Sequence, residues 1–315
     1  MRSVEAPDDA VLEEGAEVVR RYLRPTPLLS VPELGPRTWV KVECFQPTGS
    51  FKVRGALAAV AATVRRAPGV HLVAASAGNH GLGVAYAAHR LGADATVVVP
   101  ETASRAKLDA LRRYDVTLVR HGATYDDAEG FALELADGGA GHYLSPYNDP
   151  DVIAGQASIA RELAGQAPDA TTIVLPVGGG GLASGVALAT AGRGVRIVGV
   201  EPQASATMAA AVTGGRAGAE EETVADGLAG GIEPGSVTVD ILATLQVEMV
   251  AVDEEAIRSA VRFLATGVGV VAEGAGAAAT AAVRAGGLDL DDGPVVIVVT
   301  GRNIEPGLLA SIVAA

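Results

Sequence analysis

The chain has 315 residues, of which 49% are hydrophobic and 3% aromatic, and its formal net charge at pH 7 is −13. This length allows a large buried core in one or two domains, while the acidic balance argues against nucleic acid as a partner because phosphate binding needs clustered basic residues. No apolar run is long enough to cross a bilayer, and the single cysteine, Cys44, suits a reducing compartment. We therefore expect a cytoplasmic protein whose partner is a small molecule, with no membrane involved.

Short apolar runs alternate with helical periodicity along most of the chain. In chain order, strands are predicted at 39–43, 71–76, 96–99, 117–119, 142–144, 172–177, 196–201, 247–252 and 295–300. Helices are predicted at 51–65, 81–91, 104–114, 125–136, 152–164, 182–191, 254–266 and 276–285. This alternation is typical of α/β proteins in which helices cover both faces of mostly parallel sheets. Glycines and other small residues follow nearly every strand, at the edge where such folds bind ligands.

Lysine is rare in this sequence, which makes its positions informative. There are three lysines against 21 arginines, and Lys52 follows the turn Thr48-Gly49-Ser50-Phe51 at the start of a predicted helix. An ammonium can lose its proton and attack a carbonyl, whereas a guanidinium stays charged. On its own Lys52 also fits an ordinary solvated lysine in a first helical turn, so the interpretation depends on its neighbours.

Four consecutive glycines, Gly178, Gly179, Gly180 and Gly181, separate a predicted strand from a predicted helix. Backbone N–H groups at a helix N-terminus bind phosphate, and glycines let the backbone wrap around a compact group. The spacing Gly178-x-Gly180-x-x-Ala183, with Glu201 at the end of the next strand, also approaches the dinucleotide fingerprint. From this loop alone, a monophosphate cofactor and an NAD-linked dehydrogenase are both open.

The segment at 47–56, Pro-Thr-Gly-Ser-Phe-Lys-Val-Arg-Gly-Ala, resembles the pyridoxal-phosphate lysine segment of the fold-type II serine/threonine dehydratases and serine racemases. Further matches occur in the family's order at 76–80, 152–156, 176–182, 223–227, 273–277 and 300–303. The resemblance implies a fold of two open, twisted, mostly parallel sheets with helices on both faces. It also implies a large domain (1–68 and 148–315), a small substrate-closing domain (69–147), and a homodimer.

The resemblance assigns roles to individual residues. Lys52 would form the Schiff base with the cofactor and then take the Cα proton of the substrate. The cofactor would be bound by Phe51, Lys52, Asn79, Gly178, Gly179, Gly180, Gly181, Leu182, Glu273 and Thr300, with Thr300 facing the pyridine nitrogen. The substrate would be bound by Ser76, Ala77, Gly78, Asn79 and His80, although His80 is as compatible with a structural role.

Three positions bear on the choice of reaction within the family. Val53 replaces the aspartate usual in sulfur-amino-acid synthases, and Ala77 replaces the serine that a racemase needs as its second acid/base. The sequence therefore favours dehydration of a β-hydroxy α-amino acid, L-threonine or L-serine, to a 2-oxo acid and ammonia. Racemisation is an alternative within the family. Arg302 replaces a glycine, and it leaves open a substrate with a second carboxylate, 3-hydroxyaspartate.

A cation site is weakly indicated at the end of the strand predicted at 196–201. Relatives that bind a divalent cation use a glutamate, a carbonyl and an aspartate, whereas the matching positions here are Glu201, Ser205 and Thr207. Because hard divalent ions prefer several charged oxygen ligands, we expect at most a weakly bound cation at Glu201 and Ser205.

Overall fold

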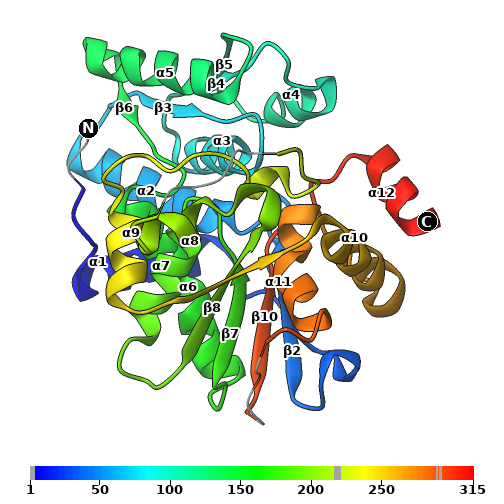
Figure 1. The fold of residues 1–315 in the computed structure, drawn as a ribbon. Coiled ribbons are helices and arrows are strands. Elements are labelled where there is room, and N and C mark those ends of the chain that lie inside the picture. Colours follow the sequence, from blue (N-terminus) through cyan, green and yellow to red (C-terminus); the bar gives the residue numbers. More distant parts are fainter. Residues whose placement is uncertain (1–3, 216–220, 289, 291–292) are drawn as a thin grey trace.

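The computed structural model describes residues 4–215, 221–288, 290 and 293–315, and it contains two sheets (Figure 1). The strands are β1 (Leu28–Ser30), β2 (Thr38–Val42), β3 (Leu72–Ala75), β4 (Ala95–Val99), β5 (Thr117–Arg120), β6 (His142–Tyr143), β7 (Thr172–Pro176), β8 (Arg196–Pro202), β9 (Glu248–Val252) and β10 (Val295–Val299). The helices are α1 (Asp9–Tyr22), α2 (Lys52–Arg66), α3 (Asn79–Leu91), α4 (Arg105–Leu111), α5 (Tyr125–Leu135), α6 (Pro150–Gln166), α7 (Gly181–Thr190), α8 (Thr207–Val212), α9 (Val237–Thr244), α10 (Glu254–Phe263), α11 (Gly274–Arg284) and α12 (Pro306–Ala314).

The larger sheet has the strand order β1-β2-β10-β7-β8-β9, and the smaller one has the order β5-β4-β3-β6. The antiparallel pair is β1 with β2, and the other neighbouring strands pair in parallel. The expected fold class, mostly parallel sheets in an α/β arrangement, is thus confirmed. Strands of the smaller sheet all lie between residues 72 and 143.

The strand β10 shows why the apolar runs are continuous rather than alternating. Val295, Ile297 and Val299 pack with α10 and α11, while Val296 and Val298 pack on the opposite face with α6 and α7. Because both faces of a parallel sheet are covered, every side chain of such a strand is buried. The smaller sheet follows the same rule, with α5 on one face and α2, α3 and α4 on the other.

Helices α2 and α6 cross at a point where only glycine fits. An added Cβ at Gly155 would lie 2.6 Å from the Cα of Gly55, and one at Gly55 would lie 2.8 Å from the carbonyl oxygen of Val152. Glycine therefore allows the two backbones to touch. The contact fixes the start of α2 relative to the larger sheet.

Close to this crossing, four charged side chains form a buried network. Arg54 donates from Nε and Nη2 to both oxygens of Glu43, at 2.7 and 2.8 Å, and from Nη1 to Glu162 at 2.7 Å. Lys41 donates to Glu162 at 2.5 Å. Arg54, Glu43 and Lys41 are 0% exposed and the Glu162 side chain is 12% exposed, so three of the four charges are held away from water and the fourth nearly so.

The predicted strands and helices agree with the structure to within a few residues, but several short or terminal elements were not predicted. Helix α1 begins after Asp8, whose carboxylate accepts from Val11 N, and it buries Leu12 and Val19 against α2 and α6. Strand β1 has three residues and lies at the sheet edge, where half-exposed side chains give no continuous apolar run. The helices α8, α9 and α12 are short and were also not predicted.

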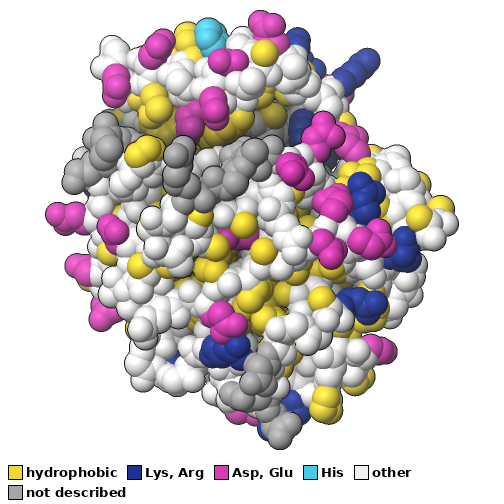
Figure 2. Space-filling view, viewed as in Figure 1, with side chains coloured by type: hydrophobic (Ala, Val, Ile, Leu, Met, Phe, Trp, Pro, Cys, Tyr) yellow, Lys and Arg dark blue, Asp and Glu magenta, His cyan; other side chains and the backbone are white. Residues whose placement is uncertain are grey.

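The face of the molecule shown in Figure 2 carries more acidic than basic side chains, in keeping with the net charge. Among the described residues, no helix combines the length and the apolar character needed to span a membrane. The segment at 214–222 is rich in glycine, alanine and glutamate, which predicts a polar surface loop, but most of it, residues 216–220, lies outside the described part of the chain.

Candidate active site

Lys52 is the first residue of α2, directly after a turn that requires glycine. Gly49 has φ +78°, a conformation that side chains disfavour, and an added Cβ there would lie 2.4 Å from Asn303 Oδ1. The Lys52 amine donates to the carbonyl oxygen of Pro146 at 3.0 Å and lies 5.3 Å from the centre of the Phe51 ring. Burial lowers the pKa of Lys52 to about 8. A substantial share of the amine is therefore neutral, and able to act as a nucleophile or base, near physiological pH.

The segment before Lys52 is joined to the end of β10. Ser50 pairs with Gly301 in an antiparallel bridge, and the Phe51 amide donates to the Thr300 carbonyl oxygen at 3.0 Å. Thr300 is 3% exposed. These contacts bring the predicted lysine and the predicted partner of the pyridine nitrogen to one edge of the larger sheet.

Asn79 is held in a fixed orientation by two partners from different parts of the chain. Its Nδ2 donates to Glu273 Oε1 at 2.6 Å, and its Oδ1 accepts from Asn303 Nδ2 at 2.6 Å. The backbone N–H of Asn303 donates to the other carboxylate oxygen of Glu273, Oε2, at 2.9 Å. Burial raises the pKa of Glu273 to about 7, against the opposing effect of the Asn79 hydrogen bond. With Oδ1 and one N–H of Asn79 engaged, the second N–H has a defined direction.

The turn at 76–80 connects β3 to α3. The Gly78 amide donates to Ser76 Oγ at 3.0 Å, and a Cβ at Gly81 would lie 2.1 Å from the Ser76 carbonyl oxygen. His80 is buried, and its Nε2 lies 2.9 Å from the Leu144 carbonyl oxygen, which can only accept. Burial and the nearby Lys52 lower the pKa of His80 to about 3, so its imidazole is neutral. Of the two roles considered for His80, this contact supports the structural one, and its substrate role stays a prediction, as do those of Ser76, Ala77 and Gly78.

The four glycines form a loop that ends β7 and begins α7. Gly180 has φ +85°, and a Cβ at Gly179 would lie 2.2 Å from the ring of Tyr147. The first N–H groups of α7, which include those of Gly181 and Leu182, have no acceptor within their own helix, so they are available to an anion. Phosphate binding at this loop stays a prediction, and these amides are the groups that would bind the phosphate.

Two contributors to the site were not predicted from the sequence. Tyr147 packs on the glycine loop, and the Pro146 carbonyl meets the Lys52 amine. Asn303 was part of a recognised motif but received no role of its own. The scarcity of aromatic residues is the signal that could have drawn attention to Tyr147.

Glu201 lies in β8, and Ser205 lies two residues before α8. Glu201 accepts from the amides of Met208 and Ala209 at 2.7 and 2.8 Å, and Ser205 Oγ accepts from Gly230 N at 3.3 Å. Among the described residues, no group of three or more histidine, cysteine or acidic side chains is arranged to hold a metal ion. The carboxylate of Glu201 thus serves the α8 backbone in this structure.

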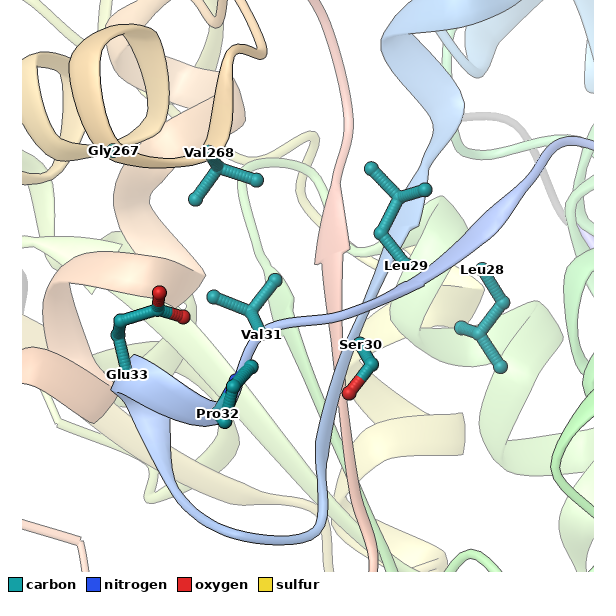
Figure 3. A pocket seen from close by; sticks show the side chains of 8 residues that line it. All are labelled: Leu28, Leu29, Ser30, Val31, Pro32, Glu33, Gly267 and Val268. Carbon is teal, nitrogen blue, oxygen red and sulfur yellow. The ribbon is translucent and has the colours of Figure 1, made fainter.

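A cavity of about 420 Å³ lies beside β1 and contains none of the predicted site residues (Figure 3). It is lined by the segment 28–33 and by Gly267 and Val268. This cavity is therefore not part of the candidate site.

Comparison with known proteins identifies the family of this chain. A family model described as "Pyridoxal-phosphate dependent enzyme" matches residues 19–301. The chain belongs to this family. The match also excludes the NAD-linked dehydrogenase. The acid which that alternative would use to bind a ribose, Glu201, accepts hydrogen bonds from the α8 backbone instead.

Two curated relatives cover most of the chain. One is the L-threonine ammonia-lyase of Thermotoga maritima, 40% identical over 283 residues, which are 89% of this chain and 70% of that protein. The other is the catabolic L-threonine dehydratase TdcB of Staphylococcus aureus, 34% identical over 309 residues, which are 93% of this chain and 88% of that protein.

Solved structures give the same picture of the fold. Serine racemase from maize superposes with a TM-score of 0.89 at 28% identity, over 98% of this chain and 97% of that one. The processed form of threonine deaminase isoform 2 from Solanum lycopersicum superposes with a TM-score of 0.88 at 30% identity, over 99% of this chain and 90% of that one.

The residues present fit pyridoxal phosphate. The cofactor needs an amine for its aldehyde, a phosphate site and polar groups around its ring. Lys52 supplies a half-buried amine, the glycine loop supplies helix N-terminal amides, and Asn79 offers an oriented N–H. The glycine loop follows β7 and Asn79 follows β3, whereas Lys52 begins α2 and is joined to the end of β10 through the Phe51 amide.

Proposed function

We propose that the protein is a pyridoxal-phosphate dependent ammonia-lyase that converts L-threonine or L-serine to a 2-oxo acid and ammonia. The observation that supports it most is the Lys52 amine, 3.0 Å from the Pro146 carbonyl, in a chain 40% identical to an L-threonine ammonia-lyase. The pKa of about 8 suits an amine that must be neutral at one step and protonated at the next.

The proposed roles follow from the chemistry of each side chain. The cofactor, when bound, supplies the electron sink for the Cα carbanion. Lys52 Nζ takes the Cα proton, and the β-hydroxyl leaves as water when it receives a proton in turn, which the Lys52 ammonium supplies, so that the step releases one water. Water then hydrolyses the released product to the 2-oxo acid and ammonia. The turn at 76–80 receives the substrate carboxylate at the N-terminus of α3, where backbone amides favour an anion.

Asn79 and Thr300 are proposed to orient the cofactor ring. The remaining N–H of Asn79 would donate to the 3′ oxygen, and its direction is set by Glu273 and Asn303. The Thr300 hydroxyl would face the ring nitrogen. A neutral hydroxyl stabilises a protonated nitrogen less than a carboxylate does, so a departing β-hydroxyl, which relieves the carbanion, suits this site.

Two other reactions of the same family are weighed against dehydration. Similar structures include serine racemases, but Ala77 has no group that could move a proton on the second face of Cα. A substrate with a second carboxylate would need a cation near the site, and Arg302 is the candidate. Its side chain is exposed, and its backbone N–H donates to Gly49 at 2.9 Å. An Arg302→Gly variant that lost activity equally on all substrates would exclude that role.

The first test is the absorption spectrum of the purified protein, followed by addition of L-threonine and L-serine with detection of 2-oxo acid. Support would be a visible cofactor band that borohydride abolishes, that Lys52→Ala lacks, and that accompanies 2-oxo acid release. A band without turnover would reject these substrates and direct the search to racemisation and other β-hydroxy amino acids. A protein that stays colourless with added pyridoxal phosphate would refute the proposal.

Four finer features stay proposals. We propose that residues 69–147 move as a unit over the substrate, that two chains form a homodimer, that the protein is cytoplasmic, and that a weakly bound cation lies at Glu201 and Ser205. Light scattering tests the dimer. A rise in the thermal midpoint with added K⁺ or Mg²⁺, absent in Glu201→Gln, tests the cation.

A further inference from the structure

The glycine loop has no side chains of its own, so its shape depends on what surrounds it. Glycine has more backbone freedom than any other residue, and four in succession would form a mobile segment if nothing restrained them. On one side, Thr238 Oγ1 donates to the Gly179 carbonyl oxygen at 2.8 Å. On the other side lies Tyr147.

Tyr147 covers the loop with its ring and its backbone. Added Cβ atoms at Gly179 and Gly181 would lie 2.2 Å from its Cδ1 and 3.0 Å from its Cα. Its hydroxyl accepts from the Glu233 amide at 2.8 Å. The ring occupies the space that a side chain at position 179 would need, and the Tyr147 backbone closely limits the space at position 181, which gives a reason for glycine at both positions.

The segment that carries Tyr147 is itself held in place. Asn148 Nδ2 donates to Glu233 at 2.9 Å, its Oδ1 accepts from Val237 N at 3.1 Å, and its own N–H donates to Ser145 Oγ at 3.0 Å. Ser145 and Asn148 are each 1% exposed. Between them, the Pro146 carbonyl oxygen accepts from the Lys52 amine. One short segment therefore contacts both the glycine loop and the catalytic amine.

We propose that Tyr147 is a positioning residue that holds the glycine loop in its phosphate-binding shape and keeps that loop at a fixed place relative to Lys52. The inference rests on the proposed placement of the cofactor phosphate at this loop. It goes beyond that placement because it assigns the shape of the loop to a side chain about thirty residues earlier in the chain.

The test compares two ligands on the full chain after the cofactor has been removed by dialysis against cysteine. Pyridoxal phosphate uses Lys52, the ring partners Asn79 and Thr300, and the loop, whereas pyridoxal lacks the phosphate and therefore uses the same groups without the loop. Tyr147→Ala is expected to weaken binding of pyridoxal phosphate about tenfold or more, because the loop must then be ordered on binding, and to leave pyridoxal binding within about twofold. Tyr147→Phe keeps the ring and is expected to stay close to wild type.

Tyr114→Ala is the matched control, since Tyr114 is a half-buried ring that packs on Tyr86, away from the loop. Equal losses for the two ligands in Tyr147→Ala, or no loss for either, would overturn the proposal. If wild-type protein bound both ligands equally, the phosphate placement would fail instead, so the two failures are distinguishable.

A second variant keeps the proposal testable if Tyr147→Ala does not fold. Gly179→Ala places a methyl group where the ring lies and is expected to reduce phosphate-dependent binding in the same selective way. Where Tyr147→Ala does fold, the methyl meets no ring in the double variant, so the additional effect of Gly179→Ala should nearly vanish. Additive effects of the two substitutions would refute a role for their contact.

Discussion

Replacing Arg54 by methionine should show how much the buried charge network contributes to stability. Arg54 makes two hydrogen bonds to Glu43, and both side chains are 0% exposed. Removing the guanidinium leaves Glu43 as a buried carboxylate without its cation, whereas Glu162 keeps Lys41 at 2.5 Å. Breaking a buried ion pair from one side costs about 3–5 kcal/mol, and we expect a loss of that size in the free energy of unfolding.

The double variant Arg54→Met with Glu43→Leu distinguishes the cost of an unpaired buried charge from the cost of the lost contacts. It restores equal numbers of buried positive and negative charges, and apolar replacement of a buried pair is often close to neutral. We expect it to recover more than half of the loss of the single variant. Urea unfolding followed by circular dichroism gives both values. Arg20→Met, which removes an exposed pair with Glu13, is the control and should change stability by less than about 1 kcal/mol.

The pH dependence gives this prediction a sign. Burial alone raises the pKa of Glu43, but the Arg54 guanidinium outweighs it and holds the pKa below its usual range. In the wild type, the contribution of Glu43 is present above its unfolded pKa and is lost as the pH falls. Without Arg54, burial raises the pKa, so protonation stabilises the variant at low pH. The difference between wild type and Arg54→Met should shrink as the pH approaches 4.5. A single variant that lost less than about 1 kcal/mol, or a double variant as unstable as the single, would refute the reasoning.

Three further changes test other parts of the structure. Gly155→Ala should lower stability by about 1–3 kcal/mol because its methyl meets Gly55 Cα at 2.6 Å, whereas Gly165→Ala, in the same helix with open space around it, should be neutral or stabilising; equal effects would contradict the close crossing. The rate at which the stripped protein binds pyridoxal phosphate should rise with pH up to about 8, where Lys52 loses its proton, and level off above; a rate still rising steeply at about pH 10 would mean an unshifted amine. Because burial raises the folded-state pKa of Glu273 to about 7, the contribution of this carboxyl to stability is present below about pH 4.5 and is lost as the pH rises through 7. In Glu273→Gln the thermal midpoint should therefore depend less on pH between about pH 5 and 8. A pH dependence as steep as in the wild type would mean that another group titrates.

The sequence allowed the covered strands and the motif residues to be predicted because both leave local signals. Residues 295–299 are all β-branched and buried on both faces, so the run itself marks the strand. The segment before Lys52 is similarly informative, because the positive φ at position 49 favours glycine. These features depend on neighbours in the chain.

Tyr147, β1 and the burial of Arg54 could not be predicted in the same way. Tyr147 acquires its role from glycines about thirty residues later, and the scarcity of aromatic residues marks the tyrosine but not that contact. Strand β1 is defined by its pairing with β2 at an exposed edge. Arg54 would ordinarily be assigned to the surface, and its burial depends on Glu43 and Glu162 arriving from two other elements.

The position of β10 also has a consequence for synthesis of the chain. The four strands of the smaller sheet are consecutive in sequence and can pair while later residues are still being translated. The larger sheet cannot close at that stage, because β10 is the last strand made and lies between β2 and β7. Until residue 299 has left the ribosome, β2 and β7 each present an unpaired edge, and such edges are sites of aggregation. The nascent chain therefore depends on its last strand, more than 250 residues after β2, to join the two parts of its central sheet.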